Sequence, residues 1–549
     1  MRNQQYRTSS RVSLVSSLLQ AIVLSFNLLT TGYAAPESKG DVADCKSLES
    51  ADFVRILDAP TQITSVVSIK PAADIPSYCL VKGSVLPNVG IEIGLPSPWN
   101  GKFIELGCGG HCGVLPNDDQ FRAWCGPALR RRYACVVSDM GHQGTAEGAL
   151  WGYNNLLAKV DWGYRSTHVV ALAGKALTEY YYRRPPTKSY FVGGSTGGRQ
   201  GLQEAQRFPL DFDGIVAVAP PVDLSTIYMT FAWGIRALHD RDGRPLLGRE
   251  ELQLLTDAAA AKCDMDDGVK DGVISDPLHC AFDPAELKCR ARQTSGCLTS
   301  IQLEAVKNVY SGPMNSKGEK LSLGGPVVGS ELGQWDKNPC CGWGYSYLGF
   351  GGSHSSYESM AADAFRYLLF WPDPGPAWKL SDFDFDRDSQ RMGMMQTIYD
   401  SGNPDLRKFR TKGGKLLVFQ GLNDNSVPPR KTIDYYETVE RTMGGTRATQ
   451  SFFRLFVLPG VGHGPGGPGA DTIDYLSAIE DWVEGSKPPD RLIAARLKDS
   501  VQPRFFLTSF PLDPDQVQFT RPVYPFPIRA KYKGRGDPND ATNFGPNQP

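Results

Sequence analysis

The chain has 549 residues, with 58 Lys and Arg against 59 Asp and Glu, which gives a formal net charge of −1. Hydrophobic residues make up 41% and charged residues 21%, a balance that excludes wholesale disorder and allows a large core. The length predicts several folding units, or one large unit with an insertion. The balanced charge disfavours a protein that binds nucleic acid, because such a protein should be clearly basic.

The N-terminal segment predicts export from the cytoplasm. Residues 1–36 contain no acidic residue, three arginines precede a mostly apolar stretch at 12–29, and small residues stand at Gly32 and Ala34. This pattern is typical of a secretory signal peptide, residues 1–35, which is not part of the fold. A membrane anchor is the alternative, but polar side chains interrupt the apolar stretch. We therefore expect a secreted or periplasmic protein with no stable membrane insertion after signal cleavage, in which the twelve cysteines favour disulfides.

Strands and helices alternate along the mature chain. Residues 188–192 are a short apolar run that ends in glycines, residues 198–207 are compatible with a helix, and residues 214–219 read as a buried strand. This strand–helix–strand order predicts a largely parallel sheet. Further strands are expected at 415–419 and 452–458, and helices at 169–182 and 471–483.

The composition changes between residues 223 and 403. This stretch is rich in Gly, Pro, Asp and Cys and holds six of the twelve cysteines. We interpret residues 36–222 and 404–549 as one split core, and residues 223–403 as a domain inserted into it. From about Val501 the tail is rich in Pro and Gly, so we expect it to wrap the surface with few regular elements.

A glycine-rich pentapeptide offers a nucleophile. Gly193-Gly194-Ser195-Thr196-Gly197 fits the pattern G-x-S-x-G, and it follows an apolar strand and opens a helix, as a nucleophile elbow requires. Ser195 would then stand at a helix N-terminus, where the helix dipole favours developing negative charge. The alternative is an ordinary glycine turn with a helix-capping serine.

A serine nucleophile needs a base and an orienting carboxylate, which follow in the chain order Ser, Asp, His for this fold. His463 lies just past the strand expected at 452–458, and Asp424 lies just past the strand expected at 415–419. Taken alone, His463 could be an ordinary histidine of a surface loop, and Asp424 an ordinary aspartate of a turn. Three strand-end placements in the required order favour a triad in which His463 transfers protons for Ser195 and Asp424 fixes the imidazole tautomer.

An oxyanion hole is expected from two backbone N–H groups. One belongs to Thr196, directly after the serine, and the other should come from an early glycine loop. The loop at 107–111 follows the apolar pair Phe103 and Ile104, and Gly109 or Gly110 is its candidate donor. A plain turn at the end of a strand explains this loop nearly as well.

Longer stretches around the serine match a known family. Tyr190-Phe-Val-Gly-Gly-Ser-Thr-Gly-Gly-Arg-Gln-Gly201, together with residues 138–144, 161–165, 204–215, 464–471 and 532–540, closely resembles the tannase and feruloyl esterase family. The resemblance implies an α/β-hydrolase core with a mostly parallel sheet and a large inserted lid domain at 223–403. It also implies cleavage of carboxylic esters of aromatic acids, such as galloyl, feruloyl and related hydroxycinnamoyl esters.

The sequence departs from the family at two cysteine pairs. The family places a cysteine directly before the nucleophile and another directly after the histidine, joined by a disulfide, whereas this chain has Gly194 and Gly464 there. A second family pair near the C-terminus is also missing, since Tyr524 and Gly545 stand where cysteines are expected. We therefore predict a mobile loop around His463.

An acidic loop in the inserted segment predicts a cation. Residues 263–276 are dense in aspartates, with glycines that bend the chain, and hard cations prefer such oxygen ligands. The loop resembles the calcium loop of the family's lid. Calcium here would be structural, because the loop lies far from the triad residues in the sequence. An exposed acidic turn is the alternative, and no organic cofactor is expected. The implied ligands are the side chains of Asp264, Asp267 and Asp271 and the carbonyls of Val269 and Val273.

Two disulfides are expected in this region. Cys263 and Cys280 bracket the acidic loop and should pair, and Cys289 and Cys297 should close a second small loop. Pairings elsewhere stay open. The undecided cysteines are Cys45, Cys79, Cys108, Cys112, Cys125, Cys135, Cys340 and Cys341.

These observations favour a secreted serine esterase that acts on phenolic-acid esters of feruloyl or hydroxycinnamoyl type. Its substrate would be a small aromatic ester, free or attached to plant polysaccharide or tannin. The alternatives are a tannase acting on galloyl esters, a hydrolase of other aromatic monoesters such as a terephthalate monoester, and an inactive phenolic- or carbohydrate-binding relative. The intact Ser195, Asp424 and His463 set argues against the last of these.

Overall fold

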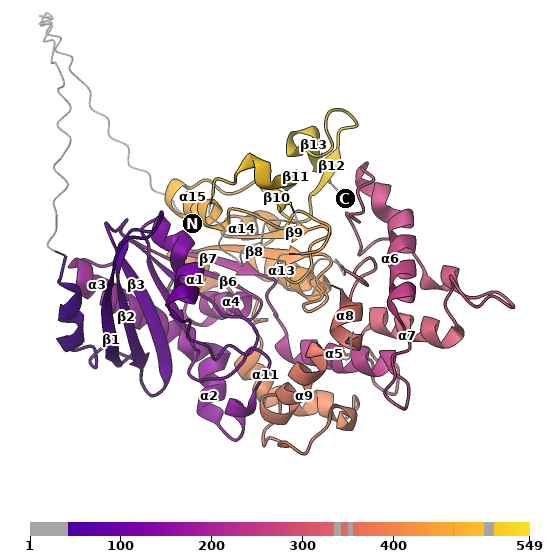
Figure 1. The fold of residues 1–549 in the computed structure, drawn as a ribbon, viewed down its shortest axis with the longest axis horizontal. Coiled ribbons are helices and arrows are strands. Elements are labelled where there is room, and N and C mark those ends of the chain that lie inside the picture. Colours follow the sequence, from indigo (N-terminus) through magenta and orange to yellow (C-terminus); the bar gives the residue numbers. More distant parts are fainter. Residues whose placement is uncertain (1–41, 334–341, 350–354, 465, 499–509, 549) are drawn as a thin grey trace, which may run out of the picture. The chain divides into compact units, whose positions relative to one another are not determined.

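A nine-stranded sheet forms the centre of the computed structural model, which describes residues 42–333, 342–349, 355–464, 466–498 and 510–548 (Figure 1). Neighbouring strands from β5 to β9 run parallel, as the sequence predicts. Three antiparallel strands that the sequence reading missed extend the sheet at one edge. The strand order is β1 (Thr61–Ile69), β2 (Ser77–Val85), β3 (Val89–Ser97), β5 (Ala134–Ser138), β4 (Lys102–Leu106), β6 (Lys188–Gly194), β7 (Gly214–Val218), β8 (Lys415–Gly421) and β9 (Phe453–Leu458).

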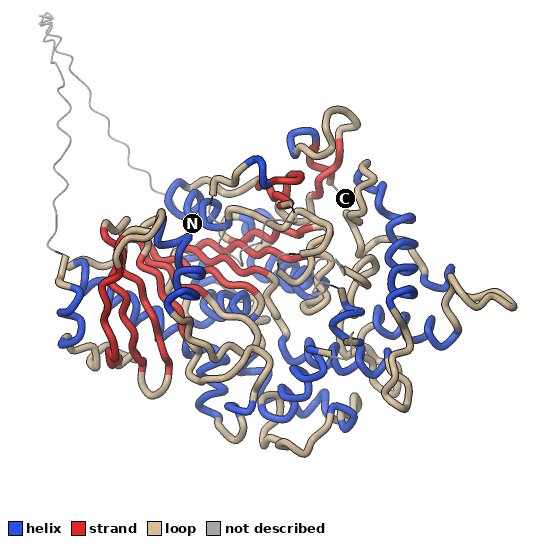
Figure 2. Tube along the Cα trace, viewed as in Figure 1, coloured by secondary structure: helices blue, strands red, loops and turns tan. Residues whose placement is uncertain are grey.

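Helices cover both faces of the parallel strands, which produces a three-layer α/β/α core (Figure 2). Side chains alternate between the faces because successive residues of a strand point to opposite sides. On β7, Ile215 and Ala217 join the hydrophobic cluster under α3 (Ser166–Tyr182), α4 (Thr196–Arg207) and α13 (Pro429–Met443). Val216 joins the opposite cluster under α1 (Asp118–Arg130) and α15 (Tyr475–Gly485).

The chain between β7 and β8 is helical and irregular. Most of its helices contribute to one hydrophobic cluster, which also takes in Met140, Ala149 and Trp162 from the segment after β5. Phe409, near the end of this stretch, instead joins the cluster under α3, α4 and α13. The boundaries of a separate lid at 223–403 stay a prediction. The helices are α5 (Leu224–Leu238), α6 (Arg249–Cys263), α7 (Ser300–Ser311), α8 (Trp343–Leu348), α9 (Ser356–Tyr367), α10 (Asp388–Arg391), α11 (Gly393–Tyr399) and α12 (Arg407–Lys412).

Two local expectations need correction. The helix expected at 471–483 begins only at Tyr475, because Thr472 bridges to Ala495 and the side chain of Asp474 caps the helix. The tail is more regular than expected, since β10 (Leu492–Leu497) pairs with β11 (Val517–Val523) and β12 (Arg529–Tyr532) pairs with β13 (Phe544–Asn547). The remaining short helices are α2 (Leu156–Val160) and α14 (Thr446–Gln450).

The five disulfides of the described residues join cysteines that lie between residues 45 and 297. The expected pairs Cys263–Cys280 and Cys289–Cys297 are confirmed. The structure also resolves the pairings that the sequence left open, as Cys45–Cys79, Cys108–Cys112 and Cys125–Cys135. The expected signal peptide, residues 1–35, and the adjacent Cys340 and Cys341 lie outside the described residues. Among the described residues, none of the helices combines the length and apolar character that crossing a bilayer requires.

Candidate active site

Ser195 occupies a sharp turn between β6 and α4. Its φ of +55° and ψ of −124° are a strained combination for a residue with a side chain, and its N–H donates to the carbonyl of Val218 at 2.9 Å. The flanking glycines are required by space. A Cβ on Gly193 would lie 2.6 Å from the backbone of Gly197, and a Cβ on Gly197 would lie 3.1 Å from the backbone of Gly107. The pentapeptide thus builds the tight, strained elbow that its pattern indicates, with Ser195 partly buried.

Three side chains from distant parts of the sequence form one hydrogen-bonded line. His463 Nε2 lies 2.8 Å from Ser195 Oγ, and His463 Nδ1 lies 2.9 Å from Asp424 Oδ2. Asp424 follows β8 and His463 follows β9, two neighbouring parallel strands whose carboxyl ends meet at the same edge of the sheet. With a proton on Nδ1, the imidazole donates to Asp424 and presents a lone pair to the serine hydroxyl.

The carboxylate of Asp424 is fully buried and saturated with donors. Oδ1 accepts from the backbone N–H groups of Ser426 at 2.9 Å and Val427 at 2.8 Å, and Oδ2 accepts from Gln420 Nε2 at 3.1 Å. Gln420 is held in turn by Thr432, whose hydroxyl donates to Gln420 Oε1 at 2.8 Å. These donors stabilise a buried negative charge that would otherwise be costly. Sequence reasoning missed Gln420, although its place near the end of β8 is a usable signal.

The inserted segment is attached directly to the loop of Asp424. Asn425 Nδ2 donates to Ser346 Oγ on α8 at 2.7 Å, and Asn423 Nδ2 donates to the carbonyl of Gly329 at 2.7 Å. Tyr357 on α9 contacts Ser426 Oγ through its hydroxyl. The inserted helices therefore help to fix the position of the carboxylate, a role that the sequence does not reveal.

The early glycine loop lies against the start of α4. Thr196 Oγ1 donates to the carbonyl of Gly110 at 2.6 Å, and the Cys108–Cys112 disulfide closes the loop. The N–H of Cys108 bonds Gln200 Oε1, and the N–H of His111 bonds the carbonyl of Ala146. A second oxyanion donor from this stretch would accordingly come from Gly109 or Gly110, the two residues expected.

A buried histidine joins this loop to the inserted segment. His111 Nε2 lies 2.7 Å from the hydroxyl of Tyr228 on α5, and Nδ1 lies 3.0 Å from the carbonyl of Glu147. Burial lowers the pKa of His111 to about 4, so its imidazole is neutral at pH 7. Its contacts fit a proton on Nδ1 and acceptance from the tyrosine at Nε2. The family resemblance gave no role to His111 or Tyr228.

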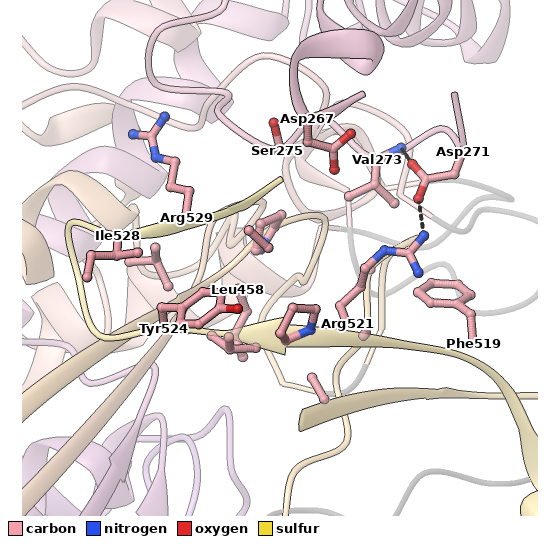
Figure 3. A pocket seen from close by; sticks show the side chains of 18 residues that line it. Asp267, Asp271, Val273, Ser275, Leu458, Phe519, Arg521, Tyr524, Ile528 and Arg529 are labelled. Atoms are coloured by element: carbon pink, nitrogen blue, oxygen red, sulfur yellow. Dashed lines mark hydrogen bonds and ion pairs between the residues drawn. The ribbon is translucent and has the colours of Figure 1, made fainter. Parts of the chain in front are cut away.

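The acidic loop that predicts a cation begins directly after α6. Asp264 Oδ1 accepts from the N–H of Gly272 at 3.0 Å, and Arg521 of β11 donates to Asp271 Oδ2 at 2.6 Å (Figure 3). Burial, reinforced by the charges of Asp271 and Asp264, raises the pKa of Asp267 to about 6. The loop thus carries three carboxylates and one guanidinium contact, and carboxylate and carbonyl oxygens are the ligands that a hard divalent cation prefers. Val269 and Val273, whose carbonyls complete the expected set, lie on the same loop.

A second group could hold a metal by residue type alone. Ligand atoms of His168, Glu204 and Asp211 lie within 4.8 Å of one another, in the core and not in the inserted segment. His168 Nδ1 lies 2.5 Å from Asp211 Oδ2, and Lys175 Nζ donates to the carbonyl of Asp211. Burial, followed by the charges of Asp211 and Glu105, raises the pKa of Glu204 well above its usual range. A proton on Glu204 and the ammonium of Lys175 therefore neutralise the negative charge of this group without a metal.

Comparisons with known proteins find similar esterases and hydrolases along most of the chain. The family described as tannase and feruloyl esterase matches residues 76–546. Mono(2-hydroxyethyl) terephthalate hydrolase of Piscinibacter sakaiensis is 32% identical, over 86% of this chain and 85% of that protein. A probable feruloyl esterase of Arthroderma benhamiae is 31% identical, over 83% of this chain and 82% of its own. The crystal structure of feruloyl esterase B from Aspergillus oryzae superposes with a TM-score of 0.76 at 27% identity, covering 91% of this chain and 99% of that one.

Proposed function

The chain belongs to the tannase and feruloyl esterase family of carboxylic ester hydrolases, and we propose that it is a secreted serine esterase that cleaves feruloyl-type esters of phenolic acids. The observation that carries the proposal is the hydrogen-bonded line from Ser195 through His463 to Asp424. The three residues lie in the order and at the strand ends that a serine hydrolase of this fold needs.

The first half-reaction forms an acyl-enzyme. Ser195 Oγ attacks the ester carbonyl carbon while His463 Nε2, 2.8 Å away, accepts the hydroxyl proton. The resulting imidazolium is stabilised by the buried carboxylate of Asp424. His463 then returns the proton to the leaving alkoxide, and the alcohol departs as the acyl group stays on Ser195.

The second half-reaction releases the acid. A water molecule gives its proton to His463 Nε2 and attacks the acyl carbon, and Ser195 recovers its proton as the carboxylic acid leaves. In both halves the developing oxyanion accepts from the backbone N–H of Thr196, whose place at the N-terminus of α4 adds the helix dipole. The second donor is Gly109 or Gly110.

Calcium has a structural place in this proposal. Asp264, Asp267 and Asp271, with the carbonyls of Val269 and Val273, would hold it, and it would supply the positive charge that links these oxygens. No reaction step passes through it. The five disulfides support export, because such bonds persist in oxidising compartments. Esters attached to plant polysaccharide or tannin would meet a secreted enzyme.

A pre-steady-state assay with a p-nitrophenyl ester tests the mechanism. The protein without residues 1–35 should give a burst of nitrophenolate equal to its active sites, and Ser195→Ala should lose the burst and at least about 10³-fold in kcat. Ser189→Ala, on the same strand β6, is the matched control and should keep both. Hydrolysis that survives Ser195→Ala would refute the triad, and a binding protein would show no burst at all.

One relative favours a second candidate substrate class. Because mono(2-hydroxyethyl) terephthalate hydrolase of Piscinibacter sakaiensis is 32% identical, an aromatic monoester is the alternative. Methyl ferulate, methyl gallate and a terephthalate monoester should be assayed side by side. A higher kcat/KM for methyl ferulate supports the proposal, and a preference for either of the others replaces the substrate class while leaving the triad in place.

A further inference from the structure

The loop that carries His463 folds back on itself. After β9, the N–H of Gly462 donates to the carbonyl of Gly466 at 2.9 Å, and the N–H of Gly469 donates to the carbonyl of Gly460 at 3.0 Å. His463 sits inside the smaller of these two turns. A segment so rich in glycine has many accessible backbone conformations, so its hydrogen bonds alone give a weak hold on the imidazole.

Asp471 closes the base of this loop. Its Oδ2 accepts from the N–H of Gly466 at 2.9 Å and from Arg496 Nη1 at 3.3 Å, and its Oδ1 accepts from the hydroxyl of Thr472 at 3.0 Å. The side chains of Asp471 and Arg496 are only 4% and 9% exposed. A buried carboxylate with a cationic partner forms charge-assisted hydrogen bonds, which are stronger than neutral ones.

Arg496 ties this carboxylate to a regular element outside the loop. It belongs to β10, which is paired with β11 along its whole length. The N–H groups of Asp471 and Thr472 both donate to the carbonyl of Ala495, at 3.2 and 3.0 Å, and the N–H of Ala495 donates back to Thr472 at 2.9 Å. The base of the loop is therefore joined to β10 by backbone and side chain together.

We propose that Asp471, held by Arg496, is a positioning residue that keeps His463 Nε2 within hydrogen-bond distance of Ser195 Oγ. It acts through the N–H of Gly466 and touches neither the reacting atoms nor Asp424. This inference rests on the proposed function, because it concerns the base of that reaction. Asp471 also restrains the loop of His463, which has no disulfide to Ser195's neighbour because glycines stand at positions 194 and 464.

The test compares three variants with the wild type in steady-state kinetics. Asp471→Ala removes the acceptor of Gly466 and should lower kcat about 10- to 100-fold with KM within about threefold, since small misplacements of a catalytic group have effects of this size. Asp471→Asn keeps an acceptor oxygen and should recover a large part of that loss. Asp474→Asn is the matched control, because it removes a nearby carboxylate that caps α15 and does not contact the loop. It should keep wild-type kcat.

A second comparison separates positioning from folding. Asp471→Ala leaves the buried guanidinium of Arg496 unpaired and could unfold the protein. The double variant Asp471→Ala/Arg496→Met removes that charge, so it should fold, as judged by its thermal transition, and still show the low kcat. The rate at which a fluorophosphonate labels Ser195 should fall with kcat, because that reaction also needs His463.

Each result has a defined meaning. A folded Asp471→Ala or double variant with kcat within threefold of wild type overturns the inference, as does an equal loss of kcat in Asp474→Asn. A low kcat that Asp471→Asn partly rescues supports it. Failure of the proposed function is visible separately, because Ser195→Ala would then remain active in the same assay.

Discussion

Asp424→Asn is the sharpest test of the active-site chemistry, because the structure dictates how the amide must lie. Two backbone N–H groups, those of Ser426 and Val427, donate to Oδ1 at 2.9 and 2.8 Å. The amide oxygen has to occupy that place, which puts the NH₂ group where Oδ2 was. The NH₂ group then faces His463 Nδ1 at 2.9 Å, nearer than the amide oxygen at 3.1 Å, and it faces Gln420 Nε2 at 3.1 Å.

The consequence is an exchanged imidazole tautomer. An NH₂ group donates to Nδ1, so the proton of neutral His463 moves to Nε2, where it faces Ser195 Oγ and cannot accept the serine proton. We expect kcat to fall about 10³- to 10⁴-fold, or about 4 to 5.5 kcal/mol of transition-state stabilisation. The new amide and Gln420 would face each other as two donors, which should also lower the free energy of unfolding by about 1–3 kcal/mol.

Wild type and Asp424→Asn should be compared by kcat and KM with a p-nitrophenyl ester and by urea unfolding. The expected outcome is a folded variant with nearly unchanged KM and a collapsed kcat. A folded variant whose kcat stays within tenfold of wild type would refute the tautomer argument. It would show either that His463 finds another orienting group or that it is not the base.

Three further outcomes are expected. Burial lowers the pKa of His142 to about 4, so its contribution to stability is complete above about pH 6.5 and is lost as the pH falls towards 4. Between pH 7 and pH 5, the free energy of unfolding in urea should therefore fall by about 2 kcal/mol more for wild type than for His142→Gln. An equal fall in the two proteins would contradict this. A calcium chelator should lower the Tm of wild type by several degrees, but not that of Asp267→Asn, and an unchanged wild-type Tm would count against the cation. Gly107→Ala places a Cβ 2.6 Å from Gly197 and should reduce kcat about tenfold or more. Gly109→Ala places its Cβ in open space and should keep kcat. Similar kcat values for the two variants would argue against this loop as an oxyanion donor.

The sequence was informative where local geometry and chemistry coincide. The elbow of Ser195 needs small neighbours within five residues, so its pattern is complete in one stretch of chain. Asp424 and His463 could be found because parallel strands bring their carboxyl ends to one edge, whatever lies between them in the sequence. The mostly parallel sheet and two disulfides that close short loops followed from the same kind of local signal.

Residues that act by supporting others were not found. Gln420 lies in no recognised motif, and Asp471 ends the family-like stretch 464–471 without any role that the sequence reveals. Each is identified only by the atom it faces, Asp424 Oδ2 or the N–H of Gly466. The antiparallel strands β1–β3 were missed as well, and so was the pairing of β10 with β11 across the C-terminal segment.

Short-range sterics and strand direction fix the elbow, the order of the chemical groups and the fold class, so these features could be read from the amino-acid chain alone. The pairing of each buried donor with its acceptor emerged only from the folded molecule. The sequence did not reveal that Gln420 is the partner of Asp424, or Arg496 the partner of Asp471. Such pairs depend on how a loop and a strand pack at ångström scale. The cost of leaving a buried polar group unpaired selects those pairs, and that cost exists only once the chain is folded.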